Sequence, residues 1–139
     1  HRLEHFADRN GSRWYNDSAA TVPEAVAAAL DAFSEPIVLI TGGTDKNLDF
    51  RPVRAAYRKA KELILLSGTG TEKLRALLDE DGVPYHGPYA DFIEAVQTAD
   101  NLAAPGHVVI LSPGCTSFGM FKNEFDRGRS FKTAVAGLP

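Results

Sequence analysis

Three short apolar runs constrain the fold of this chain more than any other feature. Each run is continuous, and each is followed at once by a turn rich in glycine, serine or threonine. The runs cover residues 37–40, 63–66 and 108–111. A strand with one face in water alternates apolar and polar residues, whereas a continuous run is typical of a strand buried on both faces of a parallel sheet. The sequence therefore predicts a buried, mostly parallel sheet.

Helical patterns fill the connections between these runs, as crossovers between parallel strands require. A first helix is expected over residues 22–33, because Thr21 and Glu24 have the spacing of a capping box and Pro23 suits a first helical turn. The other predicted elements are helices at 52–61, 71–81, 91–99 and 122–135 and a short strand near 84–86. A stripe of aromatic residues is expected to pack in the core: Phe118, Phe121 and Phe125.

The chain opens with a hairpin pattern. Asn10-Gly11, two residues that both tolerate a positive φ, separates the strand-like segments 3–7 and 12–15. A length of 139 residues is typical of one domain. The predicted fold class is therefore α/β: a Rossmann-like three-layer domain with a mostly parallel sheet and an N-terminal β-hairpin.

Composition excludes several classes of function. Acidic residues outnumber basic ones, 18 against 15, so the net charge of −3 gives no basic footprint for nucleic acid. No apolar stretch approaches the ~18–20 residues that a membrane span needs. The single cysteine, Cys115, excludes an internal disulfide and a multi-cysteine metal site, and the four histidines form no ligand-spaced cluster. Because the chain begins at His1 and its one methionine is Met120, we expect a piece of a longer protein.

The residues that follow the three runs are the candidates for binding, since ligands of such sheets bind beyond the carboxyl ends of the strands. Those ends carry the segments 41–46, 67–71 and 112–117. Glycine lets a backbone approach a ligand closely, and N–H groups at a helix start favour anions. We therefore expect an anion-binding edge, with ordinary strand-to-helix turns as the alternative.

Nucleotide-binding motifs are incomplete in this chain. No G-x-x-x-x-G-K-[ST] P-loop occurs, and Gly68-x-Gly70 lacks the third glycine of a dinucleotide fingerprint, because Lys73 stands in its place. The phosphates of any nucleotide must then be held mainly by another domain. A stand-alone nucleotide-binding module is the alternative that the missing motifs disfavour.

A few polar side chains at this edge suit an anionic ligand. Lys46 would present a mobile ammonium with three donors to a carboxylate, and the alternative is a solvated surface lysine. Thr21 and Ser117 offer hydroxyls at similar positions, where each is equally suited to capping a helix. Cys115 has neither a neighbouring histidine nor the arginine of a phosphatase loop, so it is predicted to be a structural thiol.

Three motifs carry a resemblance to a known family. They are N-D-S-x-A-T-x-P at 16–23, G-G-x-D-K-x-L-D-F at 42–50, and L-S-P-x-C-x-S-F-x-M-F-K-N at 111–123 with Arg127-Gly128 after it. In this order and spacing the chain resembles the C-terminal domain of the Mur ligases of peptidoglycan synthesis, in particular those that add D-glutamate. The resemblance covers essentially all of residues 1–139 and implies one domain of a three-domain enzyme.

The resemblance implies an ATP-dependent, amide-forming ligase. Such enzymes phosphorylate the carboxylate of UDP-N-acetylmuramoyl-L-alanine, and the amine of D-glutamate then attacks the acyl phosphate. The other two domains hold the UDP-sugar, the P-loop and Mg²⁺, while the C-terminal domain brings D-glutamate and closes over ATP. The implied enzyme is a cytoplasmic monomer of cell wall biogenesis, and thus of cell shape and cell division. This domain alone would be inactive, with no catalytic residue and no metal ligand of its own.

The same resemblance assigns roles to individual residues. Thr21, Lys46 and Ser117 would bind D-glutamate, and Arg2 and Asp17 would meet the nucleotide in the closed state. The chain departs from many relatives at two places: Ala19 stands where many have lysine, and Glu124 stands where some have phenylalanine. The alternative within the family is a related ligase with another amino-acid specificity, such as L-glutamate.

Overall fold

The computed structural model describes all residues, 1–139, as a six-stranded sheet in the order β1-β2-β6-β3-β4-β5. Strand β1 is antiparallel to β2, and every other neighbouring pair is parallel. The strands are β1 (Glu4–Arg9), β2 (Ser12–Asn16), β3 (Ile37–Thr41), β4 (Glu62–Leu66), β5 (His86–Tyr89) and β6 (Val108–Leu111). The three apolar runs thus form the central strands β6, β3 and β4, which confirms the predicted α/β sheet.

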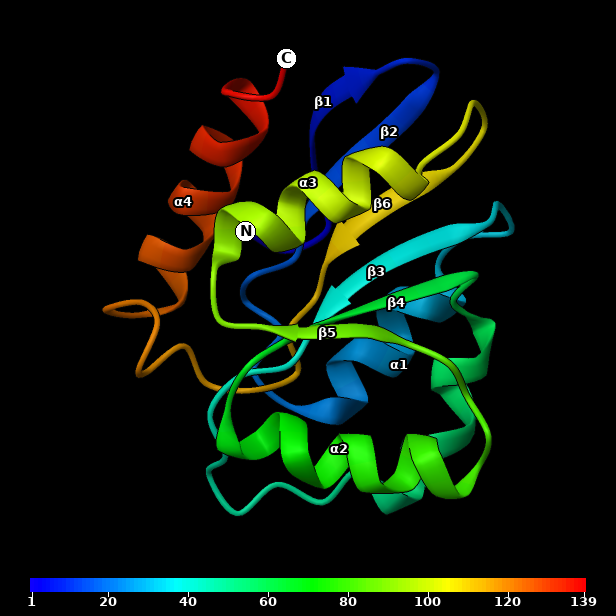
Figure 1. Cartoon of the computed structure of the whole chain (residues 1–139), viewed down its shortest axis with the longest axis vertical. Helices are drawn as coiled ribbons and strands as arrows, with labels where there is room; N and C mark the ends of the chain where they lie inside the picture. The colour runs from blue at the N-terminus through cyan, green and yellow to red at the C-terminus, as the bar shows by residue number, and fades with distance from the viewer.

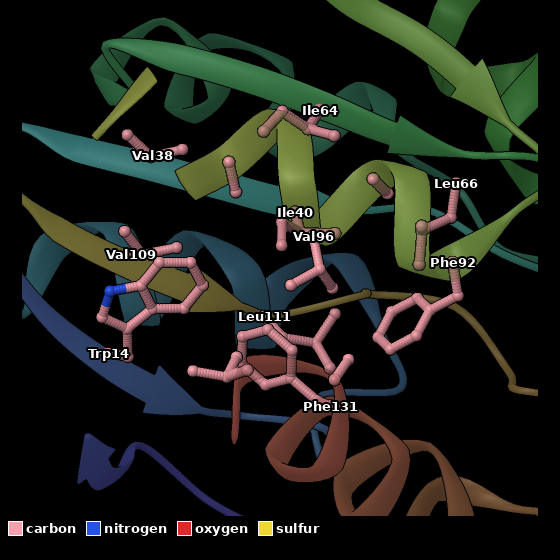
Figure 2. Packing of buried hydrophobic residues seen from close by; sticks show 14 residues of the cluster. Trp14, Val38, Ile40, Ile64, Leu66, Phe92, Val96, Val109, Leu111 and Phe131 are labelled. Carbon is pink, nitrogen blue, oxygen red and sulfur yellow. The ribbon is translucent and has the colours of Figure 1, made fainter. Parts of the chain in front are cut away.

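Helices cover both faces of this sheet (Figure 1). The helices are α1 (Pro23–Asp31), η1 (Arg51–Lys59), α2 (Thr69–Glu80), α3 (Phe92–Leu102) and α4 (Glu124–Ala136). Side chains of α3 and α4 form one hydrophobic cluster with one face of the sheet, and those of α1, η1 and α2 form a second cluster with the opposite face. Figure 2 shows the first cluster. Since the central strands are buried on both faces, the three-layer prediction is confirmed.

The N-terminal hairpin is part of the sheet. Asn10 and Gly11 adopt φ values of 49° and 82° at its turn, as the sequence predicted. Strand β2 then pairs in parallel with β6, so the hairpin extends the central strands on one side. Trp14 on β2 is fully buried, and its indole N–H donates to the Ser12 hydroxyl at 3.1 Å.

The start of α1 corrects one prediction. Val22 is the N-cap residue and Thr21 makes no cap hydrogen bond, so the expected capping box does not form. The physical reason is Pro23, whose ring disfavours helical backbone in the preceding residue. Val22 accordingly has extended backbone, with φ −132° and ψ 152°, and the helix begins one residue later, at Pro23.

Two other helical predictions need adjustment. The segment predicted at 52–61 is helical, but it forms the 3₁₀ helix η1. Helix α4 begins at Glu124, where Asn123 caps it by accepting a hydrogen bond from the Asp126 N–H. Residues 117–122 therefore form a loop, and the aromatic stripe is not one helix face. Of its members, Phe121 packs against the core, whereas Phe118 and Phe125 are exposed, so their predicted core positions are wrong.

None of these helices combines the length and apolar character that crossing a membrane demands.

Phe131 tests the packing of α4 on the sheet. Its fully buried ring lies 5.3 Å from Phe6 and 6.1 Å from Trp14, centroid to centroid. We expect Phe131→Ala to lower the free energy of unfolding by about 3–5 kcal/mol, because the cavity removes these contacts. Phe125→Ala, on the same helix but 52% exposed, should cost less than about 1 kcal/mol. Urea unfolding of both variants checks this, and equal losses would contradict the packing described.

Candidate ligand site at the carboxyl edge of the sheet

Three loops lie side by side at the carboxyl edge of the sheet, because β2, β6 and β3 are parallel neighbours. Backbone hydrogen bonds join the loops in that order. The Gly114 N–H donates to the Ala20 carbonyl at 2.8 Å. Thr44 and Thr116 exchange two N–H to carbonyl bonds of 3.1 Å each. The loops that carry Thr21, Ser117 and Lys46 are thus consecutive, as the candidate site requires.

Gly43 connects this edge to helix α2. Its carbonyl accepts the N–H groups of Gly70 at 2.9 Å and Thr71 at 3.2 Å, and its own N–H donates to the Thr71 hydroxyl at 2.9 Å. These two helix-start donors were expected to favour an anionic ligand. That expectation is wrong for α2, because the Gly43 carbonyl already accepts hydrogen bonds from both N–H groups.

The three residues predicted to bind D-glutamate share one property. No hydrogen bond or ion pair engages the side chain of Thr21, Lys46 or Ser117. Lys46 is exposed, Thr21 is half-buried, and Ser117 is 6% exposed in a narrow pocket with Gly42 and Gly43. Neither hydroxyl caps a helix, since α1 and α4 begin at other residues. The capping alternative for both is therefore excluded.

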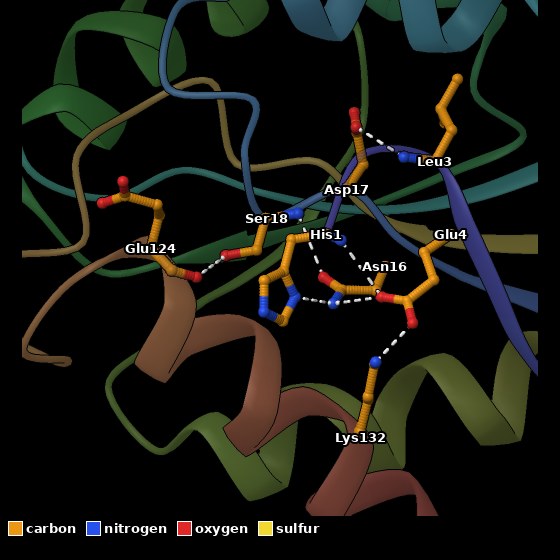
Figure 3. A network of polar contacts seen from close by, with 8 residues as sticks. All are labelled: His1, Leu3, Glu4, Asn16, Asp17, Ser18, Glu124 and Lys132. Carbon is orange, nitrogen blue, oxygen red and sulfur yellow. Dashed lines mark hydrogen bonds and ion pairs between the residues drawn. The ribbon is translucent and has the colours of Figure 1, made fainter.

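Asp17 differs from these three residues, because it is 3% exposed and both its oxygens have partners, of which Figure 3 shows the contact with Leu3. Oδ1 accepts the Leu3 N–H at 3.0 Å, and Oδ2 accepts the Ser112 hydroxyl at 2.7 Å. Burial raises the pKa of Asp17 above its usual value, although these two hydrogen bonds and the charge of Arg2 act in the opposite direction. The Arg2 side chain itself is exposed.

Both neighbours of Arg2 are bound to the domain, Leu3 through the bond to Asp17 described above and His1 through further contacts. The His1 carbonyl accepts the Ala19 N–H at 2.9 Å, and the His1 ring contacts the Asn16 amide (Figure 3). A Cβ added at Gly128 would lie only 2.3 Å from the Nδ1 atom of the His1 ring. A glycine in α4 therefore makes room for this segment beside β2.

Arg127 links the loops of the site, although the sequence pattern assigned no role to this residue. It is 1% exposed and donates to the Ser18 carbonyl at 2.8 Å, the Ser18 hydroxyl at 2.9 Å and the Cys115 carbonyl at 3.0 Å. Burial lowers the pKa of Arg127 to about 10, so the guanidinium stays charged at neutral pH. It joins the loop after β2 to the loop that leads to Ser117. Its place in the third motif was the only signal in the sequence.

Cys115 behaves as the predicted structural thiol. The side chain is buried, and burial raises the pKa of the thiol to about 12, which leaves it uncharged at neutral pH. The side chains of the chain form no group of three or more His, Cys, Asp or Glu residues with the geometry to hold a metal ion.

A substitution at Gly68 tests the close contact between Gly43 and the start of α2. A Cβ added at Gly68 would lie 2.2 Å from the Gly43 carbonyl oxygen, and backbone cannot move aside as a flexible side chain can. We expect Gly68→Ala to destabilise the domain by about 1–3 kcal/mol, as overpacking does. Gly137→Ala is the matched control, because its Cβ would meet only ordinary contacts at 3.6 Å. Thermal unfolding measures both, and equal melting temperatures would contradict the close approach.

Comparison with known proteins identifies the family. A family model described as Mur ligase, glutamate ligase domain, matches residues 1–115. The UDP-N-acetylmuramoylalanine–D-glutamate ligase of Treponema pallidum is 47% identical over 135 residues, and the ligase of the same name from Roseiflexus sp. is 51% identical over 138. Each alignment covers 97% of this chain, but only 25% and 30% of the respective relative. The chain thus spans about a quarter to a third of the length of these relatives.

Solved structures support the fold. A domain of a Haemophilus ducreyi UDP-N-acetylmuramate:L-alanyl-γ-D-glutamyl-diaminopimelate ligase aligns with a TM-score of 0.64 at 17% identity, covering 99% of this chain and 96% of that one. The UDP-N-acetylmuramate–alanine ligase of Thermotoga maritima aligns at 0.65 and 17% identity, covering 97% of this chain and 30% of that one. With the match to the family model over residues 1–115, the chain belongs to the glutamate ligase domain family of the Mur ligases.

Proposed function

We propose that this chain is the D-glutamate-positioning domain of an ATP-dependent ligase that joins D-glutamate to UDP-N-acetylmuramoyl-L-alanine. One observation carries the proposal: three donor side chains without protein partners, those of Thr21, Lys46 and Ser117, stand on three adjacent loops at one sheet edge. The names of relatives at 47% and 51% identity support D-glutamate as the amino acid. We place the activity in the peptidoglycan synthesis of the cytoplasm, in a monomeric enzyme.

The donor set suits an amino acid with two carboxylates. An ammonium and two hydroxyls can each donate to carboxylate oxygens, and a hydrogen bond to a charged group is stronger than a neutral one. None of the three side chains is a carboxylate that would pair with the substrate amino group. The amine stays free to attack an activated carboxyl group, so the domain contributes by holding the nucleophile in place.

Arg2 and Asp17 remain the proposed contacts with the nucleotide. The exposed guanidinium of Arg2 fits a phosphate group, for which arginine is well suited. Asp17 is already engaged on both oxygens, but each carboxylate oxygen can accept two hydrogen bonds, which leaves lone pairs for a ribose hydroxyl. Bound ATP and Mg²⁺ would supply the phosphoryl group and its charge neutralisation. Because the chain has no P-loop motif, most contacts to them would come from outside it.

At the two positions that depart from many relatives, the backbone holds neighbouring segments together. Ala19 offers no ammonium to a phosphate, and its backbone N–H donates to the His1 carbonyl. At Glu124 the carbonyl accepts the Ser18 hydroxyl at 2.6 Å, while the carboxylate points away from the polar network in Figure 3. The position therefore serves the joint between α4 and the loop after β2.

Lys46 is the sharpest test of the proposal. In the full-length ligase, Lys46→Ala should raise the KM for D-glutamate about tenfold to a hundredfold, because the loss of a hydrogen bond to a charged group costs ~1.5–3 kcal/mol. The KM for the UDP-sugar should change little. Steady-state kinetics with each substrate varied in turn measures both.

Lys61→Ala provides the matched control. Lys61 is also exposed, but it lies at the amino end of β4, on the opposite edge of the sheet. It should leave every KM unchanged. If Lys46→Ala also left the KM for D-glutamate unchanged, Lys46 would be an ordinary surface lysine and the proposed amino-acid site would be wrong.

The division of labour between domains gives a second test. The 139-residue chain alone, supplied with ATP, Mg²⁺, UDP-N-acetylmuramoyl-L-alanine and D-glutamate, should form no amide, because it lacks a P-loop. Product detection by mass spectrometry, with the full-length ligase as the positive control, checks this. Turnover by the chain alone would refute the proposed role as a positioning domain.

A further inference from the structure

The Lys46 loop raises a question that the proposed function leaves open. Lys46 lies between β3 and η1, in a stretch with no helix or strand of its own, and the neighbouring Asn47 has a φ of 55°. A lysine side chain is long and flexible, so its ammonium is useful to a ligand only if the backbone beneath it is fixed. Contacts from outside the loop are therefore needed to hold its backbone in place.

Lys73, on helix α2, contacts the loop on both sides of Lys46. Its ammonium lies 2.7 Å from Oδ2 of Asp45 and donates to the Leu48 carbonyl at 3.2 Å. The other Asp45 oxygen, Oδ1, accepts the Leu48 N–H at 2.9 Å. Lys73 therefore bridges both ends of the backbone turn that presents Lys46 and adds to the hydrogen bond between Asp45 and Leu48.

The helix that supplies Lys73 is itself firmly placed. Leu74 and Leu78 of α2 are buried in the hydrophobic core. Thr69, at the start of the helix, accepts the Asp45 N–H on its hydroxyl at 2.9 Å. The loop is thus tied to a rigid element at the residues before and after Lys46.

Lys73 also offsets the charge next to Lys46. The Asp45 carboxylate is ionised at neutral pH, and the hydrogen bond from Lys73, aided by the Leu48 N–H, holds its pKa below the usual value. Without Lys73, the anion one residue from Lys46 would keep the Leu48 N–H but would have no cationic partner. It would then compete with a ligand carboxylate for the Lys46 ammonium and would repel that ligand.

We propose that Lys73 is a positioning residue for the amino-acid substrate: through Asp45 and Leu48 it fixes the loop that presents Lys46. This inference rests on the proposed function, in which Lys46 binds a carboxylate of D-glutamate. Lys73 itself does not touch the substrate.

The experiment is a double-mutant cycle in the full-length ligase. Lys73→Met should raise the KM for D-glutamate about threefold to tenfold, with the KM for ATP and for the UDP-sugar unchanged. Lys73→Arg should stay within about twofold of the parent, since arginine can still pair with Asp45. In the Lys46→Ala background, Lys73→Met should have no further effect on the KM for D-glutamate, because the group it positions is gone.

Lys59→Met is the matched control, because Lys59 forms a comparable exposed ion pair with Asp31 and touches no residue of the candidate site. It should leave the KM for D-glutamate unchanged. Thermal unfolding verifies that each variant folds, and Lys73→Gln replaces Lys73→Met if methionine prevents folding.

The outcomes separate the inference from the function on which it rests. If Lys46→Ala raises the KM for D-glutamate and Lys73→Met does not, the inference on Lys73 is overturned and the proposed function stands. If the two effects multiply in the double variant, Lys73 acts independently of Lys46 and the inference is again overturned. If Lys46→Ala itself has no effect on this KM, the proposed amino-acid site fails, and the positioning role fails with it.

Discussion

The candidate site depends on the close approach of Gly43 to the start of helix α2. The Gly43 carbonyl accepts two N–H groups of the helix, and a Cβ at Gly68 would lie 2.2 Å from its oxygen. On its other side, a Cβ at Gly43 would lie 2.7 Å from the Thr116 carbonyl oxygen. Only glycine permits this distance between backbone segments. The loops after β3, β4 and β6 come into closest contact here.

The polar groups around this junction divide into two sets. Asp17 and Arg127 are buried and use their hydrogen bonds within the protein, so they stabilise the arrangement of the loops. Thr21, Lys46 and Ser117 have no protein partner for their side chains. Buried polar groups are normally paired, because an unpaired one costs free energy. The division separates buried groups that hold the loops together from side chains that have no partner within the protein.

Most of the fold could be predicted because it follows from local patterns. The continuous apolar runs identified the central strands, and Asn10-Gly11 identified the hairpin turn. The errors arose where a neighbour changed the local preference. Pro23 moved the start of α1 and removed the expected role of Thr21 as a cap. The start of α4 at Glu124 left Phe118 in a loop and exposed, although its spacing suggested a helix face.

The sequence by itself determined which residues form the buried strands and which loops follow them, since burial on both faces requires continuous apolar runs. It also determined the family, through three motifs in fixed order. Only the tertiary structure decided which polar groups are free. The helix-start donors at Gly70 and Thr71 and both oxygens of Asp17 are occupied by partners far away in the sequence, at Gly43 and Ser112. Hydrogen bonds between residues so far apart depend on how the strands are ordered in the sheet, which no local pattern specifies.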